Sequence, residues 1–162
     1  MEIHSYTRGP LLLVSACLCF SVSLPAQTSA PAVRPAGTGA YFQALVKDAK
    51  TRIREISADQ LGALQKASPS PVLLDVREDN EWDKSRIPGA IHVGRGVLDV
   101  NIESRVPQKA TPIVVYCQGG GRSAVAADVL GKMGYTNVSS LAGGLAAYQA
   151  AGLPVDKSSP PK

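Results

Sequence analysis

Several features are scarce in this 162-residue sequence, and each scarcity narrows what the protein can be. Its lysines and arginines are scattered singly, so the net charge of +4 does not gather into a surface that follows a phosphate backbone. We therefore expect no nucleic-acid partner. Its longest apolar stretch without a charge, Leu11 to Leu24, is too short for a membrane span. As a helix it would reach about 21 Å, against a hydrocarbon core of about 30 Å.

The N-terminal segment instead has the layout of a secretory signal peptide. Arg8 precedes the uncharged stretch, and small residues around Ala26 and Ala30 follow it. We expect residues 1–26 to be a signal peptide that directs export to the periplasm. A second interpretation stays open, because residues 14–17 resemble a bacterial lipoprotein box, which would place a lipid anchor on Cys17.

The sequence is also poor in cysteine. Removal of the signal peptide takes away Cys17 and Cys19 and leaves Cys117 as the only thiol. A single leftover cysteine in an exported protein is either buried and inert or kept free for reactivity. The residues around Cys117 therefore decide its role.

Composition divides the rest of the chain into a folded part and two loose segments. Residues 27–39 are rich in Ala, Pro, Thr, Ser and Gly, which predicts a flexible linker. Residues 157–162 contain two prolines and two serines and predict a disordered tail. Residues 40–156 remain as one domain, with 44% apolar residues in the whole chain to supply a core. No heptad pattern indicates an oligomer, and we expect a monomer.

Apolar residues at helical spacing predict the helices of this domain. They indicate an N-terminal helix over residues 41–53 and another over residues 123–133. Ser57 and Gln60 have capping-box spacing, so a further short helix should begin there. The first of these helices is expected to be an addition that packs on the domain.

Short apolar runs between the helices predict buried strands. They lie at residues 72–76, 113–116 and 138–141, each introduced by proline or by turn residues. Buried strands that alternate with helices are typical of an α/β fold. We expect a central parallel sheet with helices on both faces.

Cys117 follows the strand over residues 113–116 and so stands at the carboxyl end of a parallel strand, where open α/β sheets place ligand sites. The glycine run 119–121 lets the backbone turn its N–H groups toward one point. Together with Arg122 and the N-terminus of the next helix, these groups predict an anion cradle that favours the thiolate of Cys117. A purely structural role, a core cysteine before a tight turn, is the alternative.

The run from Cys117 to Ser123 resembles the active-site loop of the rhodanese family, which reads cysteine, two residues, glycine, one residue, arginine and serine. Further segments at residues 74–82, 87–91 and 143–155 are similar to the family's other motifs and occur in its order. The resemblance covers roughly residues 56–155 and implies a rhodanese-like fold with five parallel strands. Arg86 and Tyr148 depart from it, since a histidine and a tryptophan are common there.

The resemblance also implies roles for individual residues. Cys117 would be the nucleophile, and Arg122 would stabilise the donor anion and the persulfide. Asp75 and Arg77 would support the loop as an ion pair, while His92 and Trp82 are expected to be structural. The substrate-binding loop would consist of Gln118, Gly119, Gly120, Gly121 and Ser123.

The implied activity is a thiosulfate sulfurtransferase reaction without a cofactor or metal. A small anionic donor such as thiosulfate would pass sulfur to Cys117, and cyanide or a thiol would accept it. A sulfur-accepting protein is a further candidate partner.

Two alternatives stay open. The first is a sulfur carrier or partner-binding module, since rhodanese domains also serve as binding modules. The second is a cysteine phosphatase-like or arsenate reductase-like enzyme, which also uses a thiolate in a loop closed by an arginine. The phosphatase signature has five residues between cysteine and arginine, whereas four separate Cys117 from Arg122.

Overall fold

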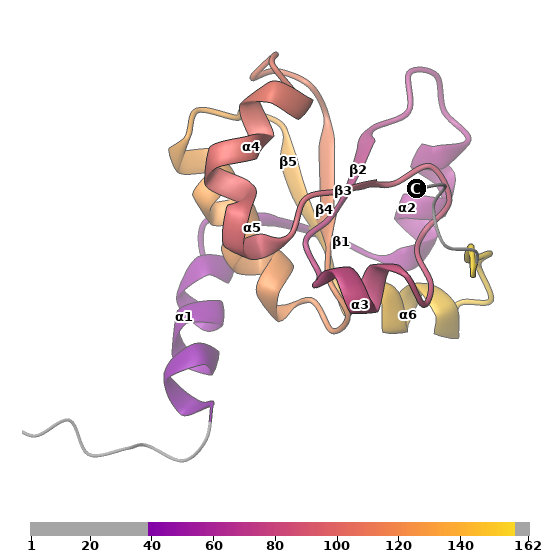
Figure 1. Cartoon of the computed structure of the whole chain (residues 1–162), viewed down its shortest axis with the longest axis horizontal. Helices are drawn as coiled ribbons and strands as arrows, with labels where there is room; N and C mark the ends of the chain where they lie inside the picture. Colours follow the sequence, from indigo (N-terminus) through magenta and orange to yellow (C-terminus); the bar gives the residue numbers. More distant parts are fainter. Residues whose placement is uncertain (1–38, 158–162) are drawn as a thin grey trace, which may run out of the picture. The chain divides into compact units, whose positions relative to one another are not determined.

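A computed structural model describes residues 39–157 of the chain. The expected signal peptide, the linker up to residue 38 and the tail from residue 158 lie outside the described residues. Within the described part, strands and helices alternate along the chain (Figure 1). Five parallel strands form one sheet in the order β1-β5-β4-β2-β3, which confirms the expected parallel sheet.

The central strand β4 is buried along its whole length, and the strands beside it are nearly so. This burial explains the continuous apolar runs, because a strand covered on both faces has no solvent-facing positions. The edges of the sheet are short strands of three and two residues. The strands are β1 (Arg54–Ile56), β2 (Val72–Asp75), β3 (Ile91–His92), β4 (Ile113–Tyr116) and β5 (Val138–Leu141).

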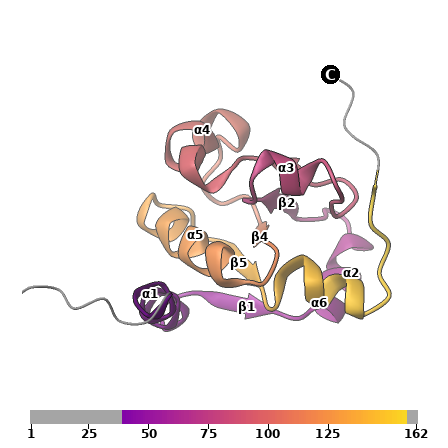
Figure 2. The same ribbon diagram turned by 60° about the horizontal axis from the view of Figure 1, so that its bottom comes forward.

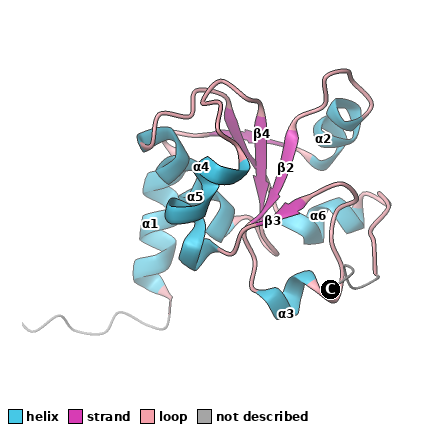
Figure 3. Ribbon diagram, turned by 45° about the horizontal axis from the view of Figure 1, so that its top comes forward, coloured by secondary structure: helices cyan, strands magenta, loops and turns pink. Residues whose placement is uncertain are grey.

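Helices cover both faces of the sheet (Figures 2 and 3). Leu74 and Val115 point into the core under α4 and α5, whereas Leu73 and Val114 point into the core under α2 and α6. This alternation follows from the two-residue period of a strand. The helices are α1 (Ala40–Lys50), α2 (Ala58–Gln65), α3 (Asp79–Trp82), the 3₁₀ helix η1 (Arg95–Val97), α4 (Leu98–Arg105), α5 (Gly121–Lys132) and α6 (Gly144–Ala150).

The N-terminal helix α1 packs against α5, as expected for an addition to the domain. Its predicted extent is wrong, because the helix ends at Lys50 and the chain then enters β1 beside β5. Residues 51–53 form a turn instead, in which the backbone N–H groups of Thr51 and Arg52 donate to the carbonyl oxygens of Asp48 and Ala49. The capping box of Ser57 and Gln60 is confirmed by both of its hydrogen bonds, at 3.2 and 2.8 Å.

Helix α5 begins at Gly121, two residues before the predicted start, so the last residue of the glycine run already belongs to it. Gly120 is the N-cap, with a φ of 88°. That left-handed conformation favours glycine and lets the chain turn sharply from β4 into α5. In residues 39–157, no helix combines the length and apolar character that crossing a membrane requires.

Candidate active site

Cys117 lies at the carboxyl end of β4, where the chain turns toward α5. It is buried, and its Sγ accepts a hydrogen bond from the backbone N–H of Gly120 at 3.2 Å. The first N–H groups of α5 have no partner within the helix, so the helix presents its positive end to this loop. The sulfur thus lies against the backbone at the start of α5.

Ser123 secures the inner side of the loop. Its buried hydroxyl donates to the carbonyl oxygen of Gly120 at 3.1 Å and accepts a hydrogen bond from the hydroxyl of Ser140 at 3.0 Å. The loop is therefore tied to α5 and β5 at once. The structure places Ser123 under the loop, so we assign it to holding the backbone rather than to contacting substrate.

Helix α6 holds the loop from another side, a contact that was not predicted from the sequence. The N–H groups of Leu145 and Ala146 donate to the carbonyl oxygens of Cys117 and Gln118, at 2.8 and 3.1 Å. Gly144 has a φ of 59°, and a Cβ there would overlap with the Cys117 carbonyl oxygen. The adjacent glycines after β5, Gly143 and Gly144, indicate a tight turn, but the sequence does not show which loop this turn contacts.

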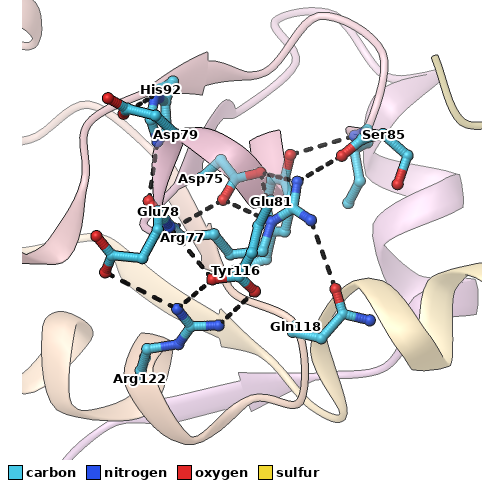
Figure 4. Close-up of polar contacts among 11 residues, drawn as sticks. Asp75, Arg77, Glu78, Asp79, Glu81, Ser85, His92, Tyr116, Gln118 and Arg122 are labelled. Carbon is cyan, nitrogen blue, oxygen red and sulfur yellow. Dashed lines mark hydrogen bonds and ion pairs between the residues drawn. The ribbon is translucent and has the colours of Figure 1, made fainter. Parts of the chain in front are cut away.

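The expected ion pair of Asp75 and Arg77 lies at the end of β2, beside the loop (Figure 4). Both side chains are almost completely buried, and Arg77 donates from Nε and Nη2 to the Asp75 carboxylate at 2.7 to 3.0 Å. The same guanidinium reaches the Gln118 side chain at 3.4 Å and the Ser85 carbonyl oxygen at 2.5 Å.

This pair links three segments of the chain. Burial acts to lower the pKa of Arg77, but the hydrogen bonds and charge of Asp75 outweigh it and raise the pKa. Arg77 therefore stays charged and connects the end of β2 to the loop at Gln118. A buried charge of this kind needs its partner, because an unpaired one is costly.

Arg122 stands at the first turn of α5 with its guanidinium on Glu81 of α3 (Figure 4). Two hydrogen bonds of 2.6 and 2.7 Å join them, and Glu78 lies 4.0 Å away. The hydrogen bonds lower the pKa of Glu81 and raise that of Arg122, to which the nearby Cys117 also contributes. Glu81 was not predicted as a site residue, because only the fold brings α3 beside α5.

Two stacked rings, those of His92 and Trp82, lie next to the backbone of Arg77. His92 stacks on Trp82 with centroids 5.0 Å apart, and its Nε2 lies 2.9 Å from the Arg77 carbonyl oxygen. The Arg86 guanidinium lies over the Trp82 ring, 4.9 Å from its centroid, and Arg86 pairs with Asp156 through backbone hydrogen bonds. These contacts join His92 and Trp82 to the end of β2, and the structural role expected for both residues stays a prediction. In the described part of the chain, no group of side chains is arranged to hold a metal ion.

Comparisons with known proteins agree with this arrangement. Residues 57–151 match the family model of the rhodanese-like domain. The thiosulfate sulfurtransferase PspE of Escherichia coli is 36% identical over 72 residues, which cover 44% of this chain and 68% of that protein. A sulfurtransferase of Allochromatium vinosum is 30% identical over 103 residues, covering 64% of this chain and 94% of that protein.

A solved structure from Rhodopseudomonas palustris is also similar. It is described as a protein of unknown function and a possible tyrosine phosphatase. It superimposes with a TM-score of 0.65 at 28% identity and covers 76% of this chain and 99% of its own. The family match begins at Ser57, so α1 and β1 lie outside it.

Proposed function

This chain belongs to the rhodanese-like domain family, and from that premise we propose that it is a thiosulfate sulfurtransferase that carries sulfur as a persulfide on Cys117. The observation that supports this most is the Cys117 sulfur inside a loop of backbone N–H groups, with the N–H of Gly120 directed at it. Relatives named as sulfurtransferases point the same way.

The proposed reaction consists of two displacements at sulfur. The Cys117 thiolate attacks the outer sulfur of thiosulfate; the new S–S bond forms as the old one breaks, and sulfite leaves with the electron pair. Cyanide or a thiolate then attacks the terminal sulfur of the persulfide and releases the Cys117 thiolate. Each step moves one sulfur atom and needs neither a redox cofactor nor a metal.

The surrounding residues have separate roles in this proposal. Gly120 and the start of α5 stabilise the thiolate and the persulfide through backbone N–H groups. Arg122 lines the same cavity as Cys117 and is positioned to contact the donor anion, with its charge largely balanced by Glu81. Asp75 and Arg77 keep the loop in place through Gln118.

A cysteine phosphatase is the second candidate, because of the description of the Rhodopseudomonas palustris structure. Four residues separate Cys117 from Arg122, so the ring of N–H groups is smaller than the phosphatase loop. Arg122 is also engaged by two hydrogen bonds to Glu81, which leaves less of its guanidinium for a phosphoryl group. Both features favour a single bound sulfur atom over a phosphoryl group.

Two assays on the same purified protein distinguish these candidates. We expect thiocyanate formation from thiosulfate and cyanide to exceed hydrolysis of an aryl phosphate by at least about 100-fold in kcat/KM, because sulfite leaves without the protonation that a phosphate leaving group needs. The inverse ranking would reverse the assignment. A persulfide that forms but is passed only to a protein acceptor would favour the sulfur-carrier alternative.

For the location we propose export to the periplasm, with the signal peptide over residues 1–26 removed. We expect cell fractionation to recover the protein in the periplasmic fraction, with a mature N-terminus after Ala26 or Ala30. A membrane-bound protein whose mature N-terminus is a lipid-modified Cys17 would instead support the lipoprotein interpretation.

A further inference from the structure

Helix α1 forms part of the cavity in which Cys117 lies. The cavity has a volume of about 350 Å³ and opens to solvent. One side is lined by Phe42, Val46 and Lys50 of α1, and the other by Cys117, Gly121 and Arg122. Since α1 precedes the family match, this wall is a feature of the chain outside the shared domain. Figures 1 and 2 show α1 beside α5.

The α1 side of the cavity is apolar close to the loop. A Cβ at Gly121 would lie 3.2 Å from the Phe42 ring and 3.5 Å from Val46, so both side chains sit directly against the start of α5. Val46 is buried, but Phe42 keeps 41% of its surface exposed. An aromatic ring that is partly open to solvent beside a reactive sulfur offers a contact surface for the apolar part of a ligand.

The charged side chains around the cavity largely neutralise one another. Lys50 pairs with Glu55 at 2.9 Å, and Arg122 pairs with Glu81 at 2.6 Å. Each cation at this rim therefore has a carboxylate partner, and Glu78 adds a further negative charge near Arg122. Such a rim offers little net positive charge to a small dianion and suits a singly charged molecule better.

We propose that α1 is a specificity-determining wall, and that Phe42 selects a sulfur donor with one negative charge and an apolar body, that is, an organic thiosulfonate, over inorganic thiosulfate. This inference rests on the proposed function. In-line attack by Cys117 on the outer sulfur directs the leaving group away from the Cys117 sulfur and into the cavity that α1 lines. The Cys117–sulfur bond forms, the bond to the sulfonyl sulfur breaks, and a sulfinate leaves with the electron pair.

The test compares benzenethiosulfonate with inorganic thiosulfate as donors, with cyanide as acceptor and thiocyanate as the measured product. We expect Phe42→Ala to lower kcat/KM for benzenethiosulfonate by about tenfold and to change kcat/KM for thiosulfate by less than about twofold, because only the aryl group loses its apolar contact. Phe42→Leu, which keeps an apolar side chain, is expected to restore most of the loss.

Leu45→Ala is the matched control, since Leu45 is 50% exposed on the same helix and does not line the cavity. It should leave both donors unaffected. An unchanged ratio of the two donors in Phe42→Ala would overturn this inference while the proposed function stands. Absence of thiocyanate from the unmodified protein with either donor would contradict the proposed function itself, and the inference with it.

Discussion

Cys117→Ser is expected to lose sulfur transfer by at least roughly 1,000-fold while the fold is retained. A hydroxyl is a far weaker nucleophile than a thiolate and forms no persulfide, so the first displacement cannot occur. The substitution keeps the shape of a buried side chain, and the serine oxygen can still accept the hydrogen bond of Gly120. Thiocyanate formation measures the loss, and thermal unfolding verifies the fold.

Mass spectrometry supplies a direct measurement of the same step. After exposure to thiosulfate, the unmodified protein should gain the mass of one sulfur atom and lose it again when cyanide is added. Cys117→Ser should gain nothing. An adduct of equal yield in Cys117→Ser would place the sulfur elsewhere and contradict the proposed role of Cys117.

Gly144→Ala should have the second large effect, on stability as well as activity. A side chain at this positive φ of 59° is strained, and its Cβ would overlap with the Cys117 carbonyl oxygen and lie 2.9 Å from the carbonyl carbon of Gln118. Strain and overpacking together should lower the free energy of unfolding by about 2–5 kcal/mol. Because the backbone that must move carries Cys117, sulfurtransferase activity should fall too.

Gly131→Ala is the matched control for this substitution. Gly131 lies near the end of α5, and a Cβ there meets nothing within 4 Å. Alanine in a helix is expected to be neutral or to stabilise the protein by about 0.5–1 kcal/mol. Denaturant unfolding measures both variants. Equal stability changes at the two positions would mean that α6 does not hold the loop in the way described.

Several elements were predictable because their signals are local. The buried strands β2, β4 and β5 each appear as a short apolar run, and the start of α2 as a capping box. The segments that were missed include β1, β3, α3 and η1, of two to four residues, and the eight-residue helix α4. The first four are too short for periodicity, and α4 buries only Leu98 and Ile102, so its conformation also depends on the neighbours that it meets in the fold.

The candidate site likewise consists of residues that are close in the sequence and residues that only the fold brings together. Cys117, the glycine run, Arg122 and Ser123 lie within seven consecutive residues, so their proximity follows from the chain itself. The sequence by itself therefore determined the family, the parallel sheet and the position of the reactive loop. Only the tertiary structure decided that Glu81 engages Arg122, that α6 fits against the Cys117 backbone and that Phe42 faces Gly121. These contacts join residues far apart in the chain, and packing alone brings them together.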